Sequence, residues 1–281
     1  MGPEEARTAG PGGARDGGRA AEAGRPESPG RAGGPDGAED GRNESPVRAR
    51  GTGRGLRALG AVLTVALVLA LITGIIRGFA GSSALFLSEM ERFAPPVRTG
   101  LPAAEYPGMA AHIADYLAGR KEDFQYEVVL PEIGRRACFH DYELIHMADC
   151  RGLIRLDGWV CLGSLLAAAV CALMLYRRRK DGLREAFRGA KDALWGLSMA
   201  AAGLLLWAAV SFDGLFLTFH RLAFRNDLWL LNPRTDLLIR LMPQGMFVDL
   251  GLKGLGAFAA GMALMTAAGL WIRRRERARG G

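Results

Sequence analysis

Four long runs of apolar residues, separated by polar segments, dominate the pattern of the chain. The uncharged runs cover residues 58–76, 158–176, 193–212 and 254–272. Each is about 20 residues long, which lets an α-helix cross roughly 30 Å of hydrocarbon. The pattern therefore predicts an all-α membrane protein with a bundle of four transmembrane helices.

The polar segments complete the predicted organisation. We expect the transmembrane helices at 56–79, 158–176, 193–217 and 250–272. The segments outside the helices are a disordered cytoplasmic tail at 1–55, a small extracytoplasmic cap at 80–157, a basic cytoplasmic loop at 177–192, an extracytoplasmic site segment at 218–249 and a short cytoplasmic tail at 273–281. The tail at 1–55 is rich in Gly, Pro, Ala and Arg and has too few large apolar residues to offset its ordering entropy.

The polar segment between the third and fourth helices differs from a simple linker. Residues 219–243 alternate bulky apolar side chains with ionisable ones, which is typical of an interfacial or re-entrant segment. In the cap, residues 109–119 predict a short amphipathic helix and 124–130 a short strand. Residues 138–156 predict a helix that leads directly into the second transmembrane helix.

Arg and Lys residues gather beside particular ends of the apolar runs. They precede the first run, separate the second from the third, and follow the fourth. The positive-inside rule therefore places both termini and the middle loop in the cytoplasm. This topology also accounts for the net charge of +7. Nucleic-acid binding is the competing interpretation, but the Arg clusters lie beside apolar spans and carry no nucleic-acid-binding motif.

All four histidines fall on the predicted extracytoplasmic side. His146 and His220 lie where a helix meets the membrane, where ionisable groups are usually functional. The alternative for each is a histidine that packs or caps a helix. We expect His112 and His140 to be surface residues, and we expect His146 and His220 to meet in one pocket.

Further polar residues surround the two histidines in the sequence. On a helix, Glu143, His146 and Asp149 share a face. If the third helix continues past Phe212, His220 and Asp227 also lie on one face of that helix. The candidate supporting residues are Glu143, Asp149, Arg221, Arg225, Asn226, Asp227 and Asp236. For the two orienting carboxylates, Asp149 and Asp227, capping or pairing with arginine is an equally weighted alternative. Trp229 is interpreted as an interfacial aromatic residue rather than a substrate contact.

Two long segments together resemble a known family. The stretches FHDYELIHMADCRGL at 139–153 and FHRLAFRNDLWLLNPRTDLLIRLMPQGMF at 219–247 are separated by a basic loop and flanked by four spans. This combination resembles the bacterial four-span membrane family that includes lipoprotein intramolecular transacylase, over about 56–272. The chain departs from the family pattern at two places. Cys150 and Arg151 stand where the family usually has Val-Lys. Gln244, Gly245 and Met246 stand where an acidic residue and paired Phe are common.

The resemblance implies an enzyme of the bacterial cell membrane. It would move an acyl chain of a diacylated lipoprotein from the sn-2 ester of the glyceryl group to the α-amino group of the modified cysteine, giving a lyso-form lipoprotein. Lipoproteins and membrane phospholipid are the implied partners, with no cofactor and no metal. A histidine titrates near neutral pH, so His146 and His220 can divide the roles of general base and general acid. Asn226, Arg221 or Arg225 would stabilise the oxyanion.

Two other classes of function remain open. A metal-dependent hydrolase could use His146, His220, Glu143 and Asp227 as ligands. A transporter or scaffold is the other alternative, although the spans contain few polar groups that could line a route. Cys138 and Cys150 both lie on the predicted extracytoplasmic side, where a disulfide between them could form.

Overall fold

The computed structural model describes residues 46–130 and 134–279, which belong to one compact unit of the chain. Within this described part, four helices are long and apolar enough to cross a membrane. They are α1 (Pro46–Ala80), α5 (Asp141–Arg177), α6 (Arg179–Val210) and α9 (Gln244–Arg279). The prediction of four spans is confirmed. Residues 46–55, which the sequence assigned to the disordered tail, are the first turns of α1; residues 1–45 lie outside the described residues.

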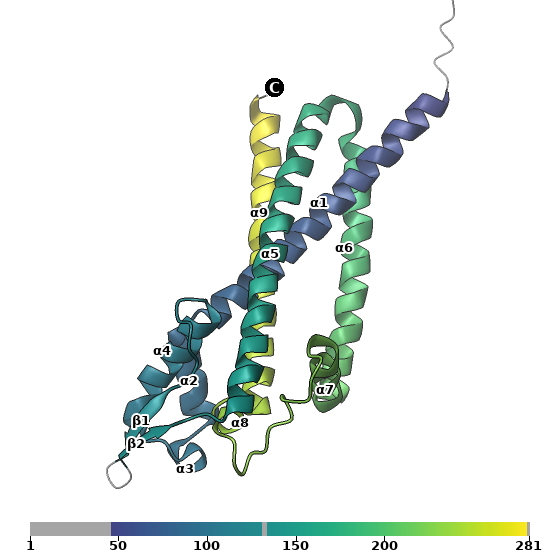
Figure 1. Cartoon of the computed structure of the whole chain (residues 1–281). Coiled ribbons are helices and arrows are strands. Elements are labelled where there is room, and N and C mark those ends of the chain that lie inside the picture. Colours follow the sequence, from purple (N-terminus) through teal and green to yellow (C-terminus); the bar gives the residue numbers. More distant parts are fainter. Residues whose placement is uncertain (1–45, 131–133, 280–281) are drawn as a thin grey trace, which may run out of the picture. The chain divides into compact units, whose positions relative to one another are not determined.

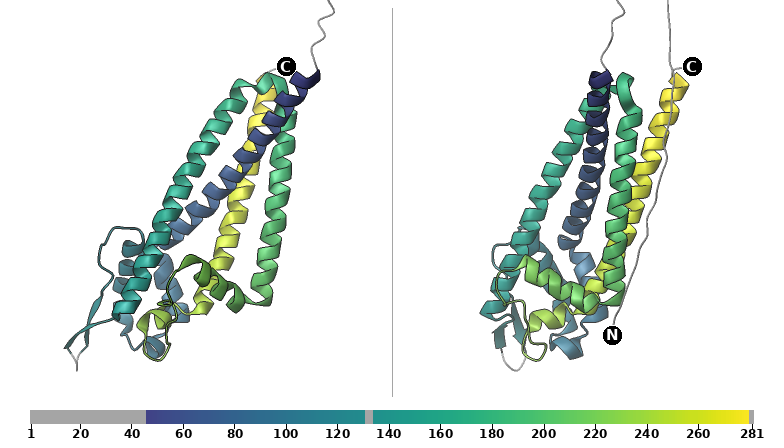
Figure 2. Two further views of the ribbon diagram at one scale, coloured as in Figure 1. Left: turned by 45° about the vertical axis from the view of Figure 1, so that its right-hand side comes forward. Right: turned by 90° about the vertical axis from the view of Figure 1, so that its right-hand side faces the viewer.

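Helix α1 packs against both α5 and α6 over much of its length and crosses between them (Figures 1 and 2). Its crossing with α6 is very close. A Cβ atom on Gly60 would lie 1.9 Å from the carbonyl oxygen of Ala186, and one on Gly189 would lie 1.8 Å from that of Arg57. Small residues at such crossings let two helix backbones approach, which is how helices associate in lipid.

The cap contains α2 (Ser83–Phe93), α3 (Pro96–Thr99), a 3-10 turn η1 (Ala103–Glu105), α4 (Tyr106–Leu117) and the antiparallel strands β1 (Glu127–Leu130) and β2 (Gly134–Ala137). The predicted helix at 109–119 and strand at 124–130 correspond to α4 and β1. Met90, Met109 and Ile113 form the centre of the cap core.

The four histidines of the chain do not share one environment. His140 is exposed, as expected, but His112 is buried on α4, so its prediction as a surface residue is wrong. The ring of His112 lies beside Phe124 and Tyr126, and its Nε2 bonds the carbonyl oxygen of Phe124 at 2.8 Å. A buried imidazole needs such a partner for its polar atoms, and this contact gives His112 a structural role.

Helix α5 confirms the predicted lead-in, because it runs without a break from the cap into the second span. The predicted loop at 177–192 is too long, since α6 already begins at Arg179. The Leu, Ala, Arg, Glu and Lys residues of this segment favour helix.

The predicted third helix at 193–217 is interrupted. Helix α6 ends at Val210, and Ser211 has an extended backbone with φ −153° and ψ 82°. Its hydroxyl accepts a hydrogen bond from the Gly214 amide at 3.2 Å and so caps a separate helix, α7 (Phe212–Ala223). Because α7 ends at Ala223, His220 and Asp227 do not share one helix face. An irregular stretch at 224–236 and the short α8 (Leu237–Leu241) lead to α9.

Candidate active site

The two predicted catalytic histidines lie side by side. His146 comes from α5 and His220 from α7, and their ring centroids are 6.2 Å apart. Both side chains are buried, with 8% of each residue exposed. Tertiary packing therefore brings together two imidazoles that are far apart in the sequence, as expected.

Aromatic rings enclose this pair. The ring centroid of Phe224 lies 4.9 Å from that of His146 and 5.5 Å from that of His220. The ring centroids of Phe216 and Trp229 lie 4.1 and 5.1 Å from that of His220. Trp229 is buried, whereas the sequence suggested only an interfacial aromatic residue. Phe216 and Phe224 were missed, although their spacing of four residues on either side of His220 is the available signal.

The hydrogen bonding of His220 fixes its neutral tautomer. Its Nδ1 lies 2.8 Å from the carbonyl oxygen of Phe216. A carbonyl can only accept, so Nδ1 carries the proton and the lone pair of Nε2 is left available. Burial lowers the pKa of His220 below its ordinary value of 6.5, and the bond to the Phe216 carbonyl opposes this shift only partly. His220 is therefore neutral at pH 7 and suited to accept a proton.

His146 has a different setting. Its Nε2 lies 3.6 Å from the sulfur of Cys150, one turn further along α5. Its Nδ1 is buried and has no hydrogen-bond partner in the described part of the chain. A buried polar atom without a partner is unusual in a folded protein. Cys138 and Cys150 are both free thiols, so the alternative of a disulfide between them is not realised.

Two of the predicted supporting residues bond to each other. The side-chain amide of Asn226 donates to Asp149 Oδ2 at 2.9 Å, and Asn226 Oδ1 accepts from the amide of Leu228 at 3.1 Å. The first bond connects α5 to the irregular stretch at 224–236, and the second shapes a turn within that stretch. Asn226 and Asp149 therefore hold the segment that carries Phe224 and Trp229 against α5.

Glu143 and Asp236 serve a neighbouring polar cluster. Glu143 is fully buried; its Oε2 accepts from the backbone amide of His140 and its Oε1 from that of Leu238, each at 2.8 Å. The carboxylate thereby caps α5 and fixes the first turn of α8. The spacing along α5 predicted a face shared with His146 and Asp149, but the partners of Glu143 are His140 and Leu238.

Asp236 occupies the N-cap position of α8. It accepts from the hydroxyls of Tyr142 and Thr235, each at 2.6 Å, and from the amide of Asn232 at 2.7 Å. Burial alone would raise the pKa of Asp236, but these hydrogen bonds outweigh burial and hold that pKa below its ordinary value. Asp236 therefore stays ionised and anchors the chain before α8 to α5.

The remaining predicted residues, Arg221, Arg225 and Asp227, are exposed. Their side chains form no hydrogen bond or ion pair with other residues that the structure describes. None of the three is hydrogen-bonded to His146 or His220.

The ligand set of the metal-dependent alternative does not assemble either. Glu143 is bonded to His140 and Leu238, and Asp227 is exposed. Across residues 46–130 and 134–279, no group of three or more His, Cys, Asp or Glu side chains is placed to hold a metal ion. The chemistry that this arrangement supports best is proton transfer between two buried imidazoles.

Solved structures show the same fold. The membrane-integral lipoprotein intramolecular transacylase Lit from Bacillus cereus is 17% identical, with a TM-score of 0.63 over 80% of this chain and 99% of that one. A form of that protein with a histidine replaced by arginine is 16% identical, with a TM-score of 0.65 over 83% of this chain and 98% of that one.

No curated protein matches the chain in a sequence search. The sequence model of one family, described as lipoprotein intramolecular transacylase Lit, matches residues 61–247. This match covers both histidines, two of the four spans completely, most of the first span and the start of α9. With its fold and its family match in agreement, the chain belongs to the lipoprotein intramolecular transacylase Lit family.

Proposed function

We propose that this protein converts a diacylated lipoprotein to its lyso form by intramolecular acyl transfer. The acyl chain on the sn-2 oxygen of the glyceryl group moves to the α-amino group of the same lipid-modified cysteine. Family membership supports the reaction class. The single structural observation that carries the proposal is the buried pair of imidazoles, with centroids 6.2 Å apart.

The two histidines divide the proton transfers. The amine nitrogen attacks the ester carbonyl carbon and forms a tetrahedral intermediate. The Nε2 lone pair of His220 takes the proton that this nitrogen loses, because Nδ1 is committed to Phe216. This proton passes from His220 to the unprotonated nitrogen of His146. The bond from the carbonyl carbon to the glycerol oxygen breaks and His146 delivers the proton to that oxygen, so both imidazoles end neutral, as they began.

No covalent intermediate on the enzyme is needed. The ester and the amine belong to one substrate molecule, so holding them in the correct geometry supplies a large part of the rate enhancement. The rings of Phe216, Phe224 and Trp229 restrict water around the histidines, which favours attack by the amine over hydrolysis. Asn226 is the candidate to steady the oxyanion, because its side-chain amide has a second N–H besides the one bonded to Asp149.

The proposal also includes an orientation. The basic residues beside the spans support cytoplasmic termini and a cytoplasmic connection between α5 and α6. The cap and α7 lie at the opposite end of the spans (Figures 1 and 2), and the two histidines lie near the start of α5 and on α7. The active site then faces the extracytoplasmic side, at the outer leaflet that holds lipoproteins.

The test uses the full chain expressed in a bacterium that makes diacylated lipoproteins and lacks this activity. Substrate and product are isomers of equal mass, so tandem mass spectrometry of the N-terminal lipopeptide must locate the acyl chain. We expect an N-acylated, monoacylglyceryl peptide whose α-amine no longer reacts with an amine reagent. A lipopeptide that has lost one acyl chain would instead identify a hydrolase, and an unchanged diacyl form would reject the proposal.

A further inference from the structure

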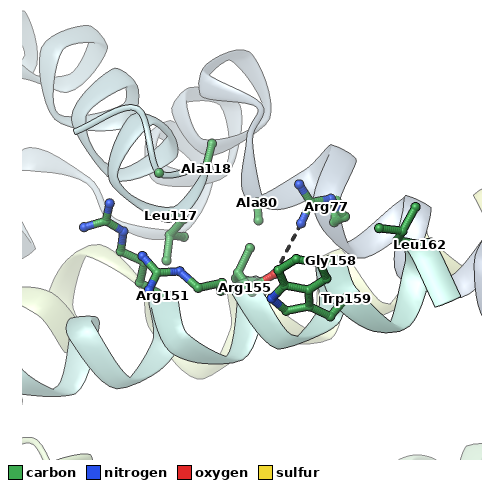
Figure 3. Close-up of a pocket in the computed structure, with 11 residues that line it drawn as sticks. Arg77, Ala80, Leu117, Ala118, Arg151, Arg155, Gly158, Trp159 and Leu162 are labelled. Carbon is green, nitrogen blue, oxygen red and sulfur yellow. Dashed lines mark hydrogen bonds between the residues drawn. The ribbon is translucent and has the colours of Figure 1, made fainter. Parts of the chain in front are cut away.

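A second site lies on another face of α5, away from the histidines. A pocket of about 470 Å³ opens between the last turn of α1, the end of α4 and the side of α5 (Figure 3). Neither His146 nor His220 lines it. Three guanidinium groups do, from Arg77, Arg151 and Arg155, together with apolar side chains.

The positive charge in this pocket is only partly balanced. Arg151 pairs with Glu122 at 3.1 Å, and its guanidinium stacks over Tyr116, 4.9 Å from the ring centroid. The side chain of Arg151 is 11% exposed, and its Nε is buried without a partner in the described part of the chain. Its acidic partner, Glu122, is 89% exposed and therefore well solvated. Both terminal nitrogens of Arg151 bond the Glu122 carboxylate, so Arg151 contributes an ordered positive charge to the pocket rather than free donors.

The other two arginines leave more donors available. Arg77 donates one N–H to the carbonyl oxygen of Ile154 at 3.3 Å and interacts electrostatically with Asp157. Arg155 forms no hydrogen bond or ion pair with any residue that the structure describes. Set against Glu122 and Asp157, the three arginines leave a net positive charge at the pocket.

The walls of the pocket change character along α5. Arg151 and Arg155 are followed by Trp159 and Leu162, spaced so that they lie along one side of the helix (Figure 3). Along α5, the cationic side chains therefore lie toward the cap and the apolar ones toward the span, with Arg77 of α1 beside Gly158 (Figure 3). Trp159 is 67% exposed, so its ring is not part of the protein core. This order matches a molecule with an anionic head and an apolar chain.

Topology makes this cluster unusual. Arginines beside spans normally gather at the cytoplasmic end, as they do here around 177–191 and 273–279. Arg77, Arg151 and Arg155 lie at the other end of α1 and α5, where the orientation rule gives no reason for basic residues. A ligand for them provides that reason, since basic pockets between transmembrane helices bind anionic lipid head groups.

We propose that this pocket binds the phosphodiester head group of an anionic membrane phospholipid. Arg77 and Arg155 donate to the phosphate, Arg151 adds its positive charge, and one acyl chain lies along Trp159 and Leu162. Guanidinium groups suit this role because they donate two parallel hydrogen bonds to phosphate oxygens. The site is separate from the histidine pair and does not depend on the proposed transacylation.

The test measures thermal unfolding of the full chain in detergent with three additives. These are short-chain phosphatidylglycerol, phosphatidylcholine with the same acyl chains, and inorganic phosphate. We expect phosphatidylglycerol alone to raise the unfolding temperature saturably. Replacing Arg155→Gln should weaken this binding about tenfold, which is typical of losing one charged hydrogen bond. Because Arg155 forms no hydrogen bond or ion pair in the described chain and only attracts the well-exposed Glu122 electrostatically, its replacement should leave the fold intact.

Arg98→Gln is the matched control. Arg98 lies on α3 in the cap, is exposed, and lines neither this pocket nor the histidine site. The Arg98→Gln variant carries the same change of charge at the same end of the molecule. It should bind phosphatidylglycerol as the wild type does. Equal stabilisation by phosphatidylcholine, equal stabilisation by inorganic phosphate, or unchanged phosphatidylglycerol binding in both Arg155→Gln and Arg77→Gln would each overturn the proposal.

Discussion

Asn226 donates a hydrogen bond to Asp149 at 2.9 Å and thereby ties the segment after α7 to the helix that carries His146. We predict that Asn226→Ala and Asp149→Ala each lower the transacylation rate by roughly tenfold, the effect of one hydrogen bond to a charged group. The double variant should be no slower than the slower single variant, because both remove the same contact. Initial rates with a synthetic diacylated lipopeptide provide the measurement. Independent, multiplicative losses would contradict a shared role.

Removal of either histidine should stop the reaction. His146→Ala and His220→Ala are each expected to lower the rate by about 10²–10⁴-fold, the usual contribution of one general acid or base. Mass spectrometry of lipoproteins from cells that express each variant provides the measurement, with membrane abundance determined in parallel. His140→Ala is the matched control, since His140 is exposed and lies outside the pair. Normal conversion by either site variant would exclude the two-histidine mechanism.

The rate should depend on the ionisation of His220. Burial lowers the pKa of His220 below 6.5, and only the neutral ring can accept a proton from the substrate amine. Activity should therefore show a loss on the acid side of pH 6.5, in addition to the loss caused by protonation of the substrate amine, whose ordinary pKa is about 8. Initial rates across the acid and neutral range measure this pH dependence, and circular dichroism confirms folding. Trp229→Phe should keep the acid-side loss, because the ring next to His220 remains apolar. A wild-type profile that follows the ionisation of the substrate amine alone would show that His220 is not the base.

Cys150 lies close enough to His146 to suggest a nucleophile and base, but we predict that no thioester forms. Because the amine attacks the ester directly, Cys150→Val should retain most of the transacylation activity. A second variant, Cys150→Ser, keeps a hydrogen-bond donor beside His146 and should behave in the same way. Rates and a search for an acylated enzyme by intact-protein mass spectrometry form the measurement. Loss of activity in both variants, or a trapped acyl-enzyme on Cys150, would reverse this prediction.

The crossing of α1 and α6 should be intolerant of any side chain. Gly60→Ala places a Cβ atom 1.9 Å from the carbonyl oxygen of Ala186, so the two helices must separate. We expect the free energy of unfolding to fall by at least about 2 kcal/mol, as overpacking against a backbone does. Thermal unfolding in detergent checks this. Gly74→Ala on the same helix is the control, since a Cβ there meets nothing within 4 Å and alanine favours helix.

Local features of the sequence were sufficient for much of the architecture. The length of the apolar runs predicted four spans, because crossing hydrocarbon sets a minimum length for a helix that depends only on local composition. The helical pattern before the second span predicted the continuous α5. Ionisable residues beside the membrane singled out His146 and His220, because their burial there is costly without a function. The family resemblance rested on ordered motifs that can be seen without coordinates.

Other features depended on contacts between distant segments. The break at Ser211 arises because its hydroxyl caps α7, which a hydrophobic run cannot show. The spacing on α5 placed Glu143 beside His146 on one face, but Glu143 bonds His140 and Leu238. His112 and Trp229 are buried because other elements cover them. Sequence periodicity tells which residues share a face of one helix. Only the packing of α5, α7 and the segment at 224–236 decides what that face meets, and this packing places the two imidazoles together.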